Sequence, residues 1–188
     1  MSEVLVWYSL QVIILLHCDK KITILFFISL IAFCATAQEE ARVVRVKDGD
    51  TYVLKTKEKE HTVRLLNVDA PELNQHWGIN AQRLVKDLII GKIVKLEIIT
   101  TDLYGRELAN IYLDGQSLDY ILVANGWAWH YVNYNHNPDL ENLMYIAKEK
   151  KLGLWECGAD RVCPPWIFRH YNARNRNRFC KGCIVKNK

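Results

Sequence analysis

The sequence predicts an α+β fold that is mainly β: a five-stranded OB-fold barrel with about three helices, followed by a cysteine-containing basic extension. Three short runs rich in β-branched residues precede the first helical pattern, and two more follow it. Two further helical patterns come after these strands. Five strands with a helix between the third and the fourth are typical of an OB-fold, a small barrel whose face often binds nucleic acid.

The first three strands are expected at residues 41–46, 51–56 and 61–68. They read "ARVVRV", "TYVLKT" and "HTVRLLNV", and the charged segments "KDGD" and "KEKE" separate them. If the third strand is regular, Arg64 shares one face with Leu66 and Val68.

The first helix is expected over residues 80–90, because apolar residues recur there three and four positions apart and Gly91 follows as a cap. Strands 92–99 and 108–115 alternate apolar and polar residues.

Two more helices complete the predicted domain. One is expected to begin after Ser117, as its N-cap, and to stop at Gly126. The other has Asn137 as its N-cap and Pro138 at its first position.

Composition indicates a globular chain with a basic end. Half of the 188 residues are apolar and 24% are charged, which excludes a disordered chain. Residues 38–160 carry 15 Lys+Arg against 19 Asp+Glu, whereas residues 161–188 carry eight cations and no acidic residue. This asymmetry suggests a polyanionic partner, although a basic tail is often only a solvated end.

Residues 1–37 are interpreted as a signal peptide. Lys20 and Lys21 precede an apolar stretch over residues 22–34, and "ATA" at 35–37 forms an A-x-A cleavage site. The apolar stretch is short for a membrane span, and an uncleaved anchor is the alternative. Residues 1–19 form a second apolar segment, which is either a long n-region or a stretch before the true start codon. The mature protein is expected to begin near Gln38, to be periplasmic or extracellular, and to be a monomer without stable membrane association.

Charged residues gather at the ends of the predicted strands. "DGDT" (48–51) places Asp50 at a surface-facing strand entrance, and "VDAPE" (68–72) ends the third strand with Asp69 and Glu72. "DLYGRELA" (102–109) places Arg106 after a glycine turn. Each motif alone is an ordinary turn or strand end, but carboxylates are the hard ligands that Ca²⁺ prefers, and the motifs together indicate a functional site.

The chain resembles the staphylococcal nuclease (thermonuclease) family from about Ala41 to Trp155. The resemblance rests on "DGDT", "VRLLNVDAPE", "DLYGREL", "LVANGWAW" and "AKEKKLGLW", which occur in this order. It implies an OB-fold domain over residues 38–155, with the signal peptide at 1–37 before it and an extension at 156–188 after it.

The resemblance also implies the roles of the charged residues. Asp50 and Asp69 would bind Ca²⁺ together with the backbone carbonyl of Ala70. The residues that would act in catalysis are Arg64, Glu72 and Arg106. The two arginines would bind the scissile phosphate, since a guanidinium forms bidentate hydrogen bonds to phosphate oxygens. Glu72 would act on the attacking water, either as a general base or by holding it.

Two aromatic residues are candidate substrate-binding residues. Tyr104 follows Leu103, where the best-known members of the family carry a lysine near the terminal phosphate of the substrate. Tyr131 lies in the aromatic segment "WAWHYVNYN" and could line a base pocket, because aromatic faces stack on any base. The alternative is that these aromatics belong to the core.

Two functions of different class follow from these residues. The first is a secreted, Ca²⁺-dependent endonuclease that hydrolyses DNA and RNA with little sequence preference, by attack of water on phosphorus. The second is a non-catalytic OB-fold module that only binds nucleic acid. The complete set of carboxylates and arginines favours the enzyme, because a binding module would have no need to keep all of them.

Four cysteines lie outside both the expected signal peptide and the segment that resembles the family: Cys157, Cys163, Cys180 and Cys183. In an oxidising compartment they predict two disulfides with three possible connectivities. A zinc site is the alternative, since "CKGC" has C-x₂-C spacing, although "CGADRVC" is spaced too widely for a usual pair. The arginine-rich stretch 169–183 would then either capture the backbone of a nucleic acid or serve only as a soluble structural end.

Overall fold

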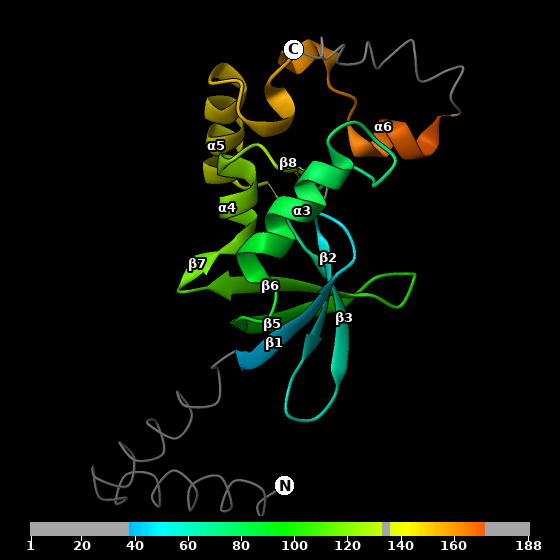
Figure 1. The fold of residues 1–188 in the computed structure, drawn as a ribbon, viewed down its shortest axis with the longest axis vertical. Coiled ribbons are helices and arrows are strands. Elements are labelled where there is room, and N and C mark those ends of the chain that lie inside the picture. The colour runs from blue at the N-terminus through cyan, green and yellow to red at the C-terminus, as the bar shows by residue number, and fades with distance from the viewer. Residues whose placement is uncertain (1–37, 133–135, 172–188) are drawn as a thin grey trace, which may run out of the picture. The chain divides into compact units, whose positions relative to one another are not determined.

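The computed structural model describes residues 38–132 and 136–171, and a closed β-barrel forms its centre (Figure 1). The sheet runs in the order β3-β2-β1-β5-β6-β7, in which β7 is the short strand Gln116–Ser117. Strand β3 also pairs with β6, which closes the barrel. The barrel strands are β1 (Glu39–Val46), β2 (Thr51–Lys55), β3 (Glu60–Leu65), β5 (Ile93–Thr101) and β6 (Glu107–Leu113). Only the β3–β6 pair is parallel among these neighbours. The predicted α+β fold with a five-stranded OB-fold barrel is confirmed.

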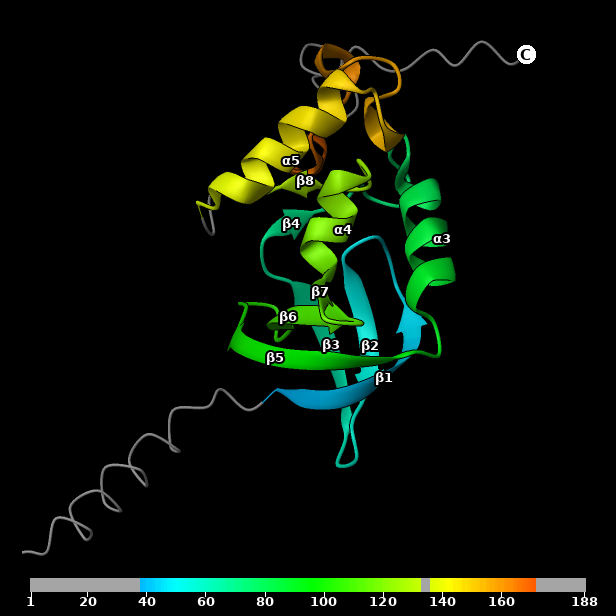
Figure 2. The ribbon, with the colours of Figure 1, turned by 90° about the vertical axis from the view of Figure 1, so that its left-hand side faces the viewer.

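Four helices accompany the barrel in the described part of the chain: α3 (Gly78–Ile89), α4 (Leu118–Ala124), α5 (Pro138–Glu149) and α6 (Pro165–His170). Figure 2 shows α3, α4 and α5 at one end of the barrel. The predicted cap of α5 is present, because the side chain of Asn137 accepts hydrogen bonds from the backbone N–H groups of Asp139 and Leu140 at 3.0 and 3.2 Å. Helix α6 was not predicted, since six residues are too few to show a helical period.

The expected third strand, residues 61–68, is in fact two strands. β3 ends at Leu65, and β4 (Val68–Asp69) pairs with β8 (Trp129–His130) outside the barrel. At the break, the buried side chain of Asn67 donates hydrogen bonds to Oδ2 of Asp119 in α4 at 2.7 Å and to Oδ1 of Asn110 in β6 at 3.4 Å. The expectation that Arg64, Leu66 and Val68 share one face of a regular strand is therefore wrong.

Short elements complete the described chain: β7 (Gln116–Ser117) and the 3₁₀ helices η2 (Gly153–Trp155) and η3 (Ala159–Arg161). No helix among residues 38–132 and 136–171 is long and apolar enough to cross a membrane. The expected signal peptide, Cys180, Cys183 and the arginines after Arg169 all lie outside the described residues.

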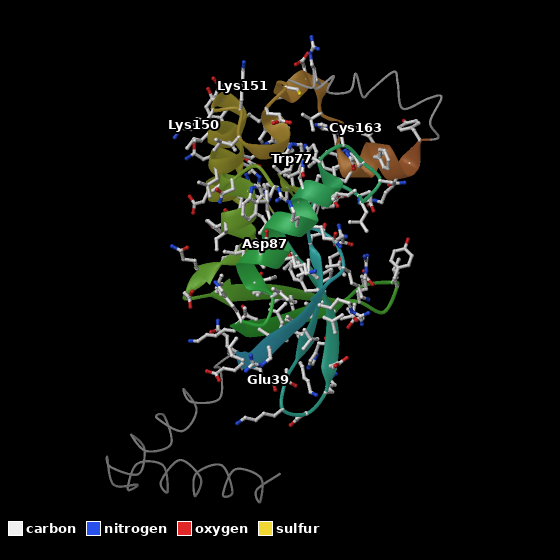
Figure 3. All side chains as sticks on the ribbon, in the orientation of Figure 1. Glu39, Trp77, Asp87, Lys150, Lys151 and Cys163 are labelled. Atoms are coloured by element: carbon white, nitrogen blue, oxygen red, sulfur yellow. The ribbon has the colours of Figure 1, made fainter. Side chains whose placement is uncertain are left out.

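Two hydrophobic clusters hold the described residues together. The first fills the interior of the barrel and includes the side chains that α3, α4 and α5 pack against it. The second consists of Trp129, Ala147, Leu154, Trp155 and Val162, with Trp77 and Trp166 packed against it. Figure 3 shows Trp77, at the start of α3, and Cys163, in the segment that leads into α6. The extension after residue 155 is thus packed on the barrel domain as far as the structure describes it.

Candidate active site

Segments that are distant in sequence meet at one cavity of about 550 Å³. Its lining side chains come from the β1–β2 turn, from β3 and the segment after it, from the β5–β6 loop, from the chain after β8, and from α6. The lining residues are Asp48, Arg64, Asp69, Glu72, Tyr104, Arg106, Tyr131 and Arg169. The structure therefore brings most of the predicted site residues together, and it adds two that were not predicted, Asp48 and Arg169.

The β1–β2 turn fixes Asp50 against the segment that carries Asp69. The side chain of Asp48 accepts hydrogen bonds from the N–H groups of Asp50 and Thr51 at 3.1 and 2.7 Å, as turn-forming aspartates do. A Cβ atom on Gly49 would lie 2.6 Å from Cβ of Ala70, so only glycine allows this close approach. The N–H of Ala70 in turn donates to Oδ2 of Asp50 at 2.8 Å.

Arg64 is paired with two carboxylates. Its Nη1 lies 3.0 Å from Oδ1 of Asp50, and its Nη2 lies 2.6 Å from Oδ1 of Asp69. The side chain of Arg64 is only 13% exposed. Burial alone would lower the pKa of Arg64, but Asp50 and Asp69 raise it above its ordinary value. The arginine in a mainly apolar strand is therefore explained by the anions at the end of that strand.

Asp50 is buried, with 2% of its surface exposed, and this corrects the expectation of a surface-facing position. Burial raises the pKa of Asp50 to about 7; Arg64 opposes this rise, while Asp48 and Asp69 add to it. The ionised form of Asp50 is thus disfavoured mainly by burial.

The loop after β4 holds Glu72 in place through its backbone. The N–H of Gln75 donates to the carbonyl of Glu72 at 2.8 Å, and Oε1 of Gln75 accepts from the N–H of Glu72 at 3.1 Å. Gly78, the first residue of α3, lies so close that a Cβ would come within 1.8 Å of the Glu72 carbonyl oxygen. The carboxylate of Glu72 itself is 36% exposed at the cavity.

Arg106 reaches the cavity from the opposite loop and is paired locally. Its Nε and Nη2 both lie 2.7 Å from Oδ2 of Asp102. Tyr104 is 85% exposed, and the guanidinium carbon of Arg106 lies 5.5 Å from the centre of its ring. Arg106 and Tyr104 are therefore available to a ligand in the cavity.

Tyr131 lies between the cavity and helix α6. It lines the cavity, and its ring centre lies 5.5 Å from that of Trp166 in α6. Trp129, by contrast, is buried in the second hydrophobic cluster, with its ring centre 5.0 Å from that of Trp155.

Arg169 was missed as a site residue in the sequence. Its Nη1 donates to Oδ1 of Asp69 at 3.0 Å and to Oε1 of Glu72 at 2.8 Å, and its Nη2 donates to Oδ2 of Asp69 at 2.7 Å. These carboxylates raise the pKa of Arg169 above its ordinary value. The available signal was weak: Arg169 opens the arginine-rich stretch, but no spacing relates it to a carboxylate about 100 residues earlier.

The donor atoms at Asp50 and Asp69 suit a hard divalent cation. Two carboxylates and the backbone carbonyl of Ala70 are oxygen ligands of the kind that Ca²⁺ takes. Burial is the main cause of the raised pKa of Asp50; Asp48 and Asp69 add to it, and a bound cation would offset their negative charge. These residues fit the expected metal.

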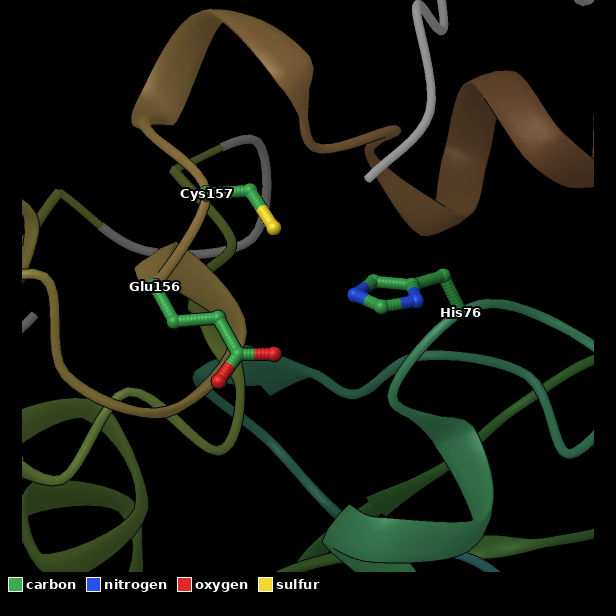
Figure 4. Close-up of side chains that lie close together, drawn as sticks. All are labelled: His76, Glu156 and Cys157. Atoms are coloured by element: carbon green, nitrogen blue, oxygen red, sulfur yellow. The ribbon is translucent and has the colours of Figure 1, made fainter. Parts of the chain in front are cut away.

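A second group of potential metal ligands does not suit a metal ion. Among the described residues, His76, Glu156 and Cys157 are the group of three whose ligand atoms all lie within 4.8 Å of one another (Figure 4). Cys157 is disulfide-bonded in the structure, so its sulfur is not a thiolate, and Glu156 accepts a hydrogen bond from Nε1 of Trp77 at 3.2 Å.

A larger cavity of about 820 Å³ lies away from these charged residues. It is lined by side chains of α3, α4, α5 and the β6–β7 turn, with Leu88, Leu113 and Leu143 among them. Because its lining contains one carboxylate, that of Asp114, and no arginine, it lacks the groups that bind and hydrolyse a phosphodiester.

Comparison with known proteins identifies relatives that match most of this chain. A family model described as "Staphylococcal nuclease homologue" matches residues 62–157. A protein of Escherichia coli O157:H7 named "Uncharacterized endonuclease" is 41% identical over 148 residues, which cover 78% of this chain and 94% of that protein. A Haemophilus influenzae protein of the same name is 34% identical over 134 residues, covering 71% and 75% of the two chains. "Staphylococcal-like nuclease CAN1" of Arabidopsis thaliana is 32% identical over 119 residues, covering 63% and 36%.

Proposed function

This chain belongs to the staphylococcal nuclease homologue family, and from that premise we propose that it is a secreted, Ca²⁺-dependent endonuclease acting on DNA and RNA with little sequence preference. One observation carries the proposal. Asp69, Glu72, Arg64 and Arg106 line the same cavity, so the groups that would bind a metal, act on water and bind a phosphate face one space.

The metal would be held by Asp50, Asp69 and the backbone carbonyl of Ala70. When bound, Ca²⁺ would supply positive charge to the phosphate and a template for substrate and water. The hydrogen bond from the Ala70 N–H to Asp50 keeps these ligands together before any ion arrives.

The two arginines would bind non-bridging oxygens of the phosphodiester. Arg64 is fixed by Asp50 and Asp69, so its guanidinium needs little reorganisation as negative charge develops on the phosphate. Arg106 is oriented in the same way by Asp102. Their hydrogen bonds to the phosphate would be charge-assisted, which makes them about twice as strong as neutral ones.

Glu72 would act on the attacking water. As the water oxygen forms a bond to phosphorus and the bond to the leaving oxygen breaks, a carboxylate within hydrogen-bond reach accepts the proton that the water loses. The loop contacts of Glu72 with Gln75 and α3 fix its backbone for this role. Holding the water in position without accepting its proton is the second role open to Glu72.

Low sequence preference follows from the kinds of group in the cavity. Arginines bind the phosphate, which is the same in every nucleotide, and tyrosines stack on the face of any base. Tyr104 and Tyr131 therefore support binding without reading base edges.

We further propose export to the periplasm or the outside of the cell, with removal of residues 1–37. The A-x-A site at residues 35–37 supports this proposal. Cys157 and Cys163 are disulfide-bonded in the structure, which supports disulfides over a zinc site for these two cysteines. Disulfides form in oxidising compartments, so this bonding also supports export. The intact mass of exported protein should correspond to a chain beginning at or near Gln38, and recovery of a membrane-bound full-length form would overturn this proposal.

Two substrates test the proposed activity. Purified protein should convert covalently closed circular DNA to nicked and linear forms, and should degrade a single-stranded RNA, with Ca²⁺ and not with excess chelator. Cutting of a closed circle requires internal cleavage, which separates endonuclease action from attack at ends. Binding of both nucleic acids without cleavage would instead establish the non-catalytic OB-fold module.

A further inference from the structure

Arg169 reaches the active site from a part of the chain that lies outside the family match, which ends at residue 157. It is in α6, near the end of the described residues (Figure 1). Its guanidinium is bidentate to Asp69 and also bonded to Glu72, and its side chain remains 42% exposed where it lines the cavity. Arg169 therefore lies beside both the expected metal ligand and the expected catalytic carboxylate.

Helix α6 is packed on the domain, which makes the position of Arg169 specific. Pro165 is buried, and Trp166 packs on Trp129 and Tyr131, with ring centres 6.4 and 5.5 Å apart. The side-chain amide of Gln75 also donates a hydrogen bond to the carbonyl of Cys163, just before α6. The loop that carries Glu72 and the helix that carries Arg169 are thus joined directly.

The charges of the site show what Arg169 does when no ligand is bound. Arg64 is paired with Asp50 and Asp69, and Arg169 is paired with Asp69 and Glu72, so Arg169 offsets negative charge at both of its partners. A divalent cation at Asp69 would take over this neutralisation. The guanidinium of Arg169 would then need a new anion in the same cavity.

We propose that Arg169 is a third phosphate-binding arginine of the active site, supplied by the C-terminal extension. This inference rests on the proposed function. Three guanidiniums, those of Arg64, Arg106 and Arg169, line one cavity, and a nucleic acid brings closely spaced phosphates. The hydrogen bonds of Arg169 to described residues use Nη1 and Nη2, which leaves Nε free to donate to a phosphate oxygen.

Arg169→Gln tests the proposal, with Arg161→Gln as the matched control. Arg161 is an exposed arginine of the same extension and does not line the cavity. Initial rates of DNA cleavage are measured across a salt series, with each variant at a Ca²⁺ concentration shown by calorimetry to saturate it. Arg169→Gln should raise KM by about 10- to 100-fold, the effect of losing a hydrogen bond to a charged group. It should also make the slope of log(kcat/KM) against log salt shallower by about 0.7–0.9.

Arg169→Lys keeps the proposal testable if the glutamine variant does not fold. Lysine retains the charge, so the salt slope should stay near that of the wild type, while KM should recover only in part because the planar fork is lost. Wild-type KM and salt slope in Arg169→Gln would overturn the proposal. A rise in its kcat/KM would overturn it too, since Arg169 would then act only as a counter-ion that competes with the metal.

Failure of the proposed function can be distinguished from failure of this inference. If the wild type cleaves nothing, the proposed function is wrong, and binding of a labelled single-stranded DNA is measured by fluorescence anisotropy instead. Weaker binding by Arg169→Gln than by Arg161→Gln would then support the inference, and equal binding would overturn it. If the wild type cleaves normally and the two variants behave alike, only the inference fails.

Discussion

At the scale of single residues, Arg64 connects the fold to the proposed chemistry. A nearly buried guanidinium without partners would be costly, and Asp50 and Asp69 remove that cost while leaving one edge of the side chain at the cavity. Arg106 has its own partner, Asp102, and is more exposed. The two arginines should therefore respond differently to substitution.

Lysine at either arginine should reduce kcat/KM by roughly 10²–10³, because the charge stays but the bidentate geometry is lost. Arg106→Lys should leave the melting temperature almost unchanged, since its pair with Asp102 is partly exposed. Arg64→Lys should also lower stability, because one ammonium cannot bridge both Asp50 and Asp69 as the fork does. Steady-state cleavage and thermal melts measure both effects, and near-wild-type turnover in either variant would refute its phosphate-binding role.

Asp119 gives a pH dependence that is independent of the active site. Burial raises its pKa to about 6, the hydrogen bond from Asn67 opposes this, and its Oδ1 has no hydrogen-bond partner among the described residues. Because the folded protein binds this proton more tightly than the unfolded chain, the Asp119 contribution to stability falls as pH rises from about 4 to about 6.

Asp119→Asn should remove this pH dependence. Relative to the wild type, the variant should gain on the order of 2–3 kcal/mol in free energy of unfolding between pH 4 and pH 7. Denaturant unfolding of both proteins at the two pH values measures this difference. A constant difference across the range would mean that Asp119 titrates in the folded protein as it does in the unfolded chain.

At the scale of elements, the turn between β1 and β2 must meet the segment after β4 closely. Gly49→Ala would place a Cβ 2.6 Å from that of Ala70, and should destabilise the fold by about 1–3 kcal/mol and weaken Ca²⁺ binding. Adding Ala70→Gly removes the clashing atom, so the double variant should recover part of both losses. Calorimetric Ca²⁺ binding and denaturant melts test this cycle, and purely additive losses would show that the two residues do not interact.

The barrel and most of its site were predictable because they depend on sequence patterns within short segments. Strand periodicity gave the five barrel strands, and the caps of α5 follow from Asn137 and Pro138. The break after Leu65 was not predictable, because the contacts of Asn67 at the break are with residues far away in the sequence, such as Asp119, 52 residues away. Arg169 was missed for the same reason: its position depends on the docking of α6, and a six-residue helix has no readable period.

At the scale of the whole molecule, the extension becomes part of the catalytic domain. Val162 and Trp166 pack into the second hydrophobic cluster, and the chain after α6 continues into the arginine-rich stretch. The larger part of that stretch lies outside the described residues. Its expected role as a substrate-capturing arm stays a prediction, and the position of α6 beside the cavity supports it.

Replacing Arg174, Arg176 and Arg178 together by Gln should reduce the slope of log affinity against log salt by roughly 2–3 units, at about 0.7–0.9 per phosphate contact. Turnover at saturating substrate and low salt should barely change, since the replaced residues are not proposed catalytic groups. Lys150 and Lys151 at the end of α5 (Figure 3), changed to Gln together, are the control. An unchanged slope in the triple variant would leave the stretch a structural end.

We propose that one cavity joins a Ca²⁺ site to a carboxylate that acts on water. The most direct measurement is the initial rate of nicking of closed circular DNA as free Ca²⁺ is raised from chelated levels, for the wild type beside Glu72→Gln. The wild-type rate should rise from background and saturate. The variant should be slower by about 10²–10⁴-fold, as expected for loss of a general base, while calorimetry shows that it still binds Ca²⁺. Equal rates in chelator and in Ca²⁺ would exclude the Ca²⁺ requirement, and a Glu72→Gln rate equal to that of the wild type would exclude the role of Glu72.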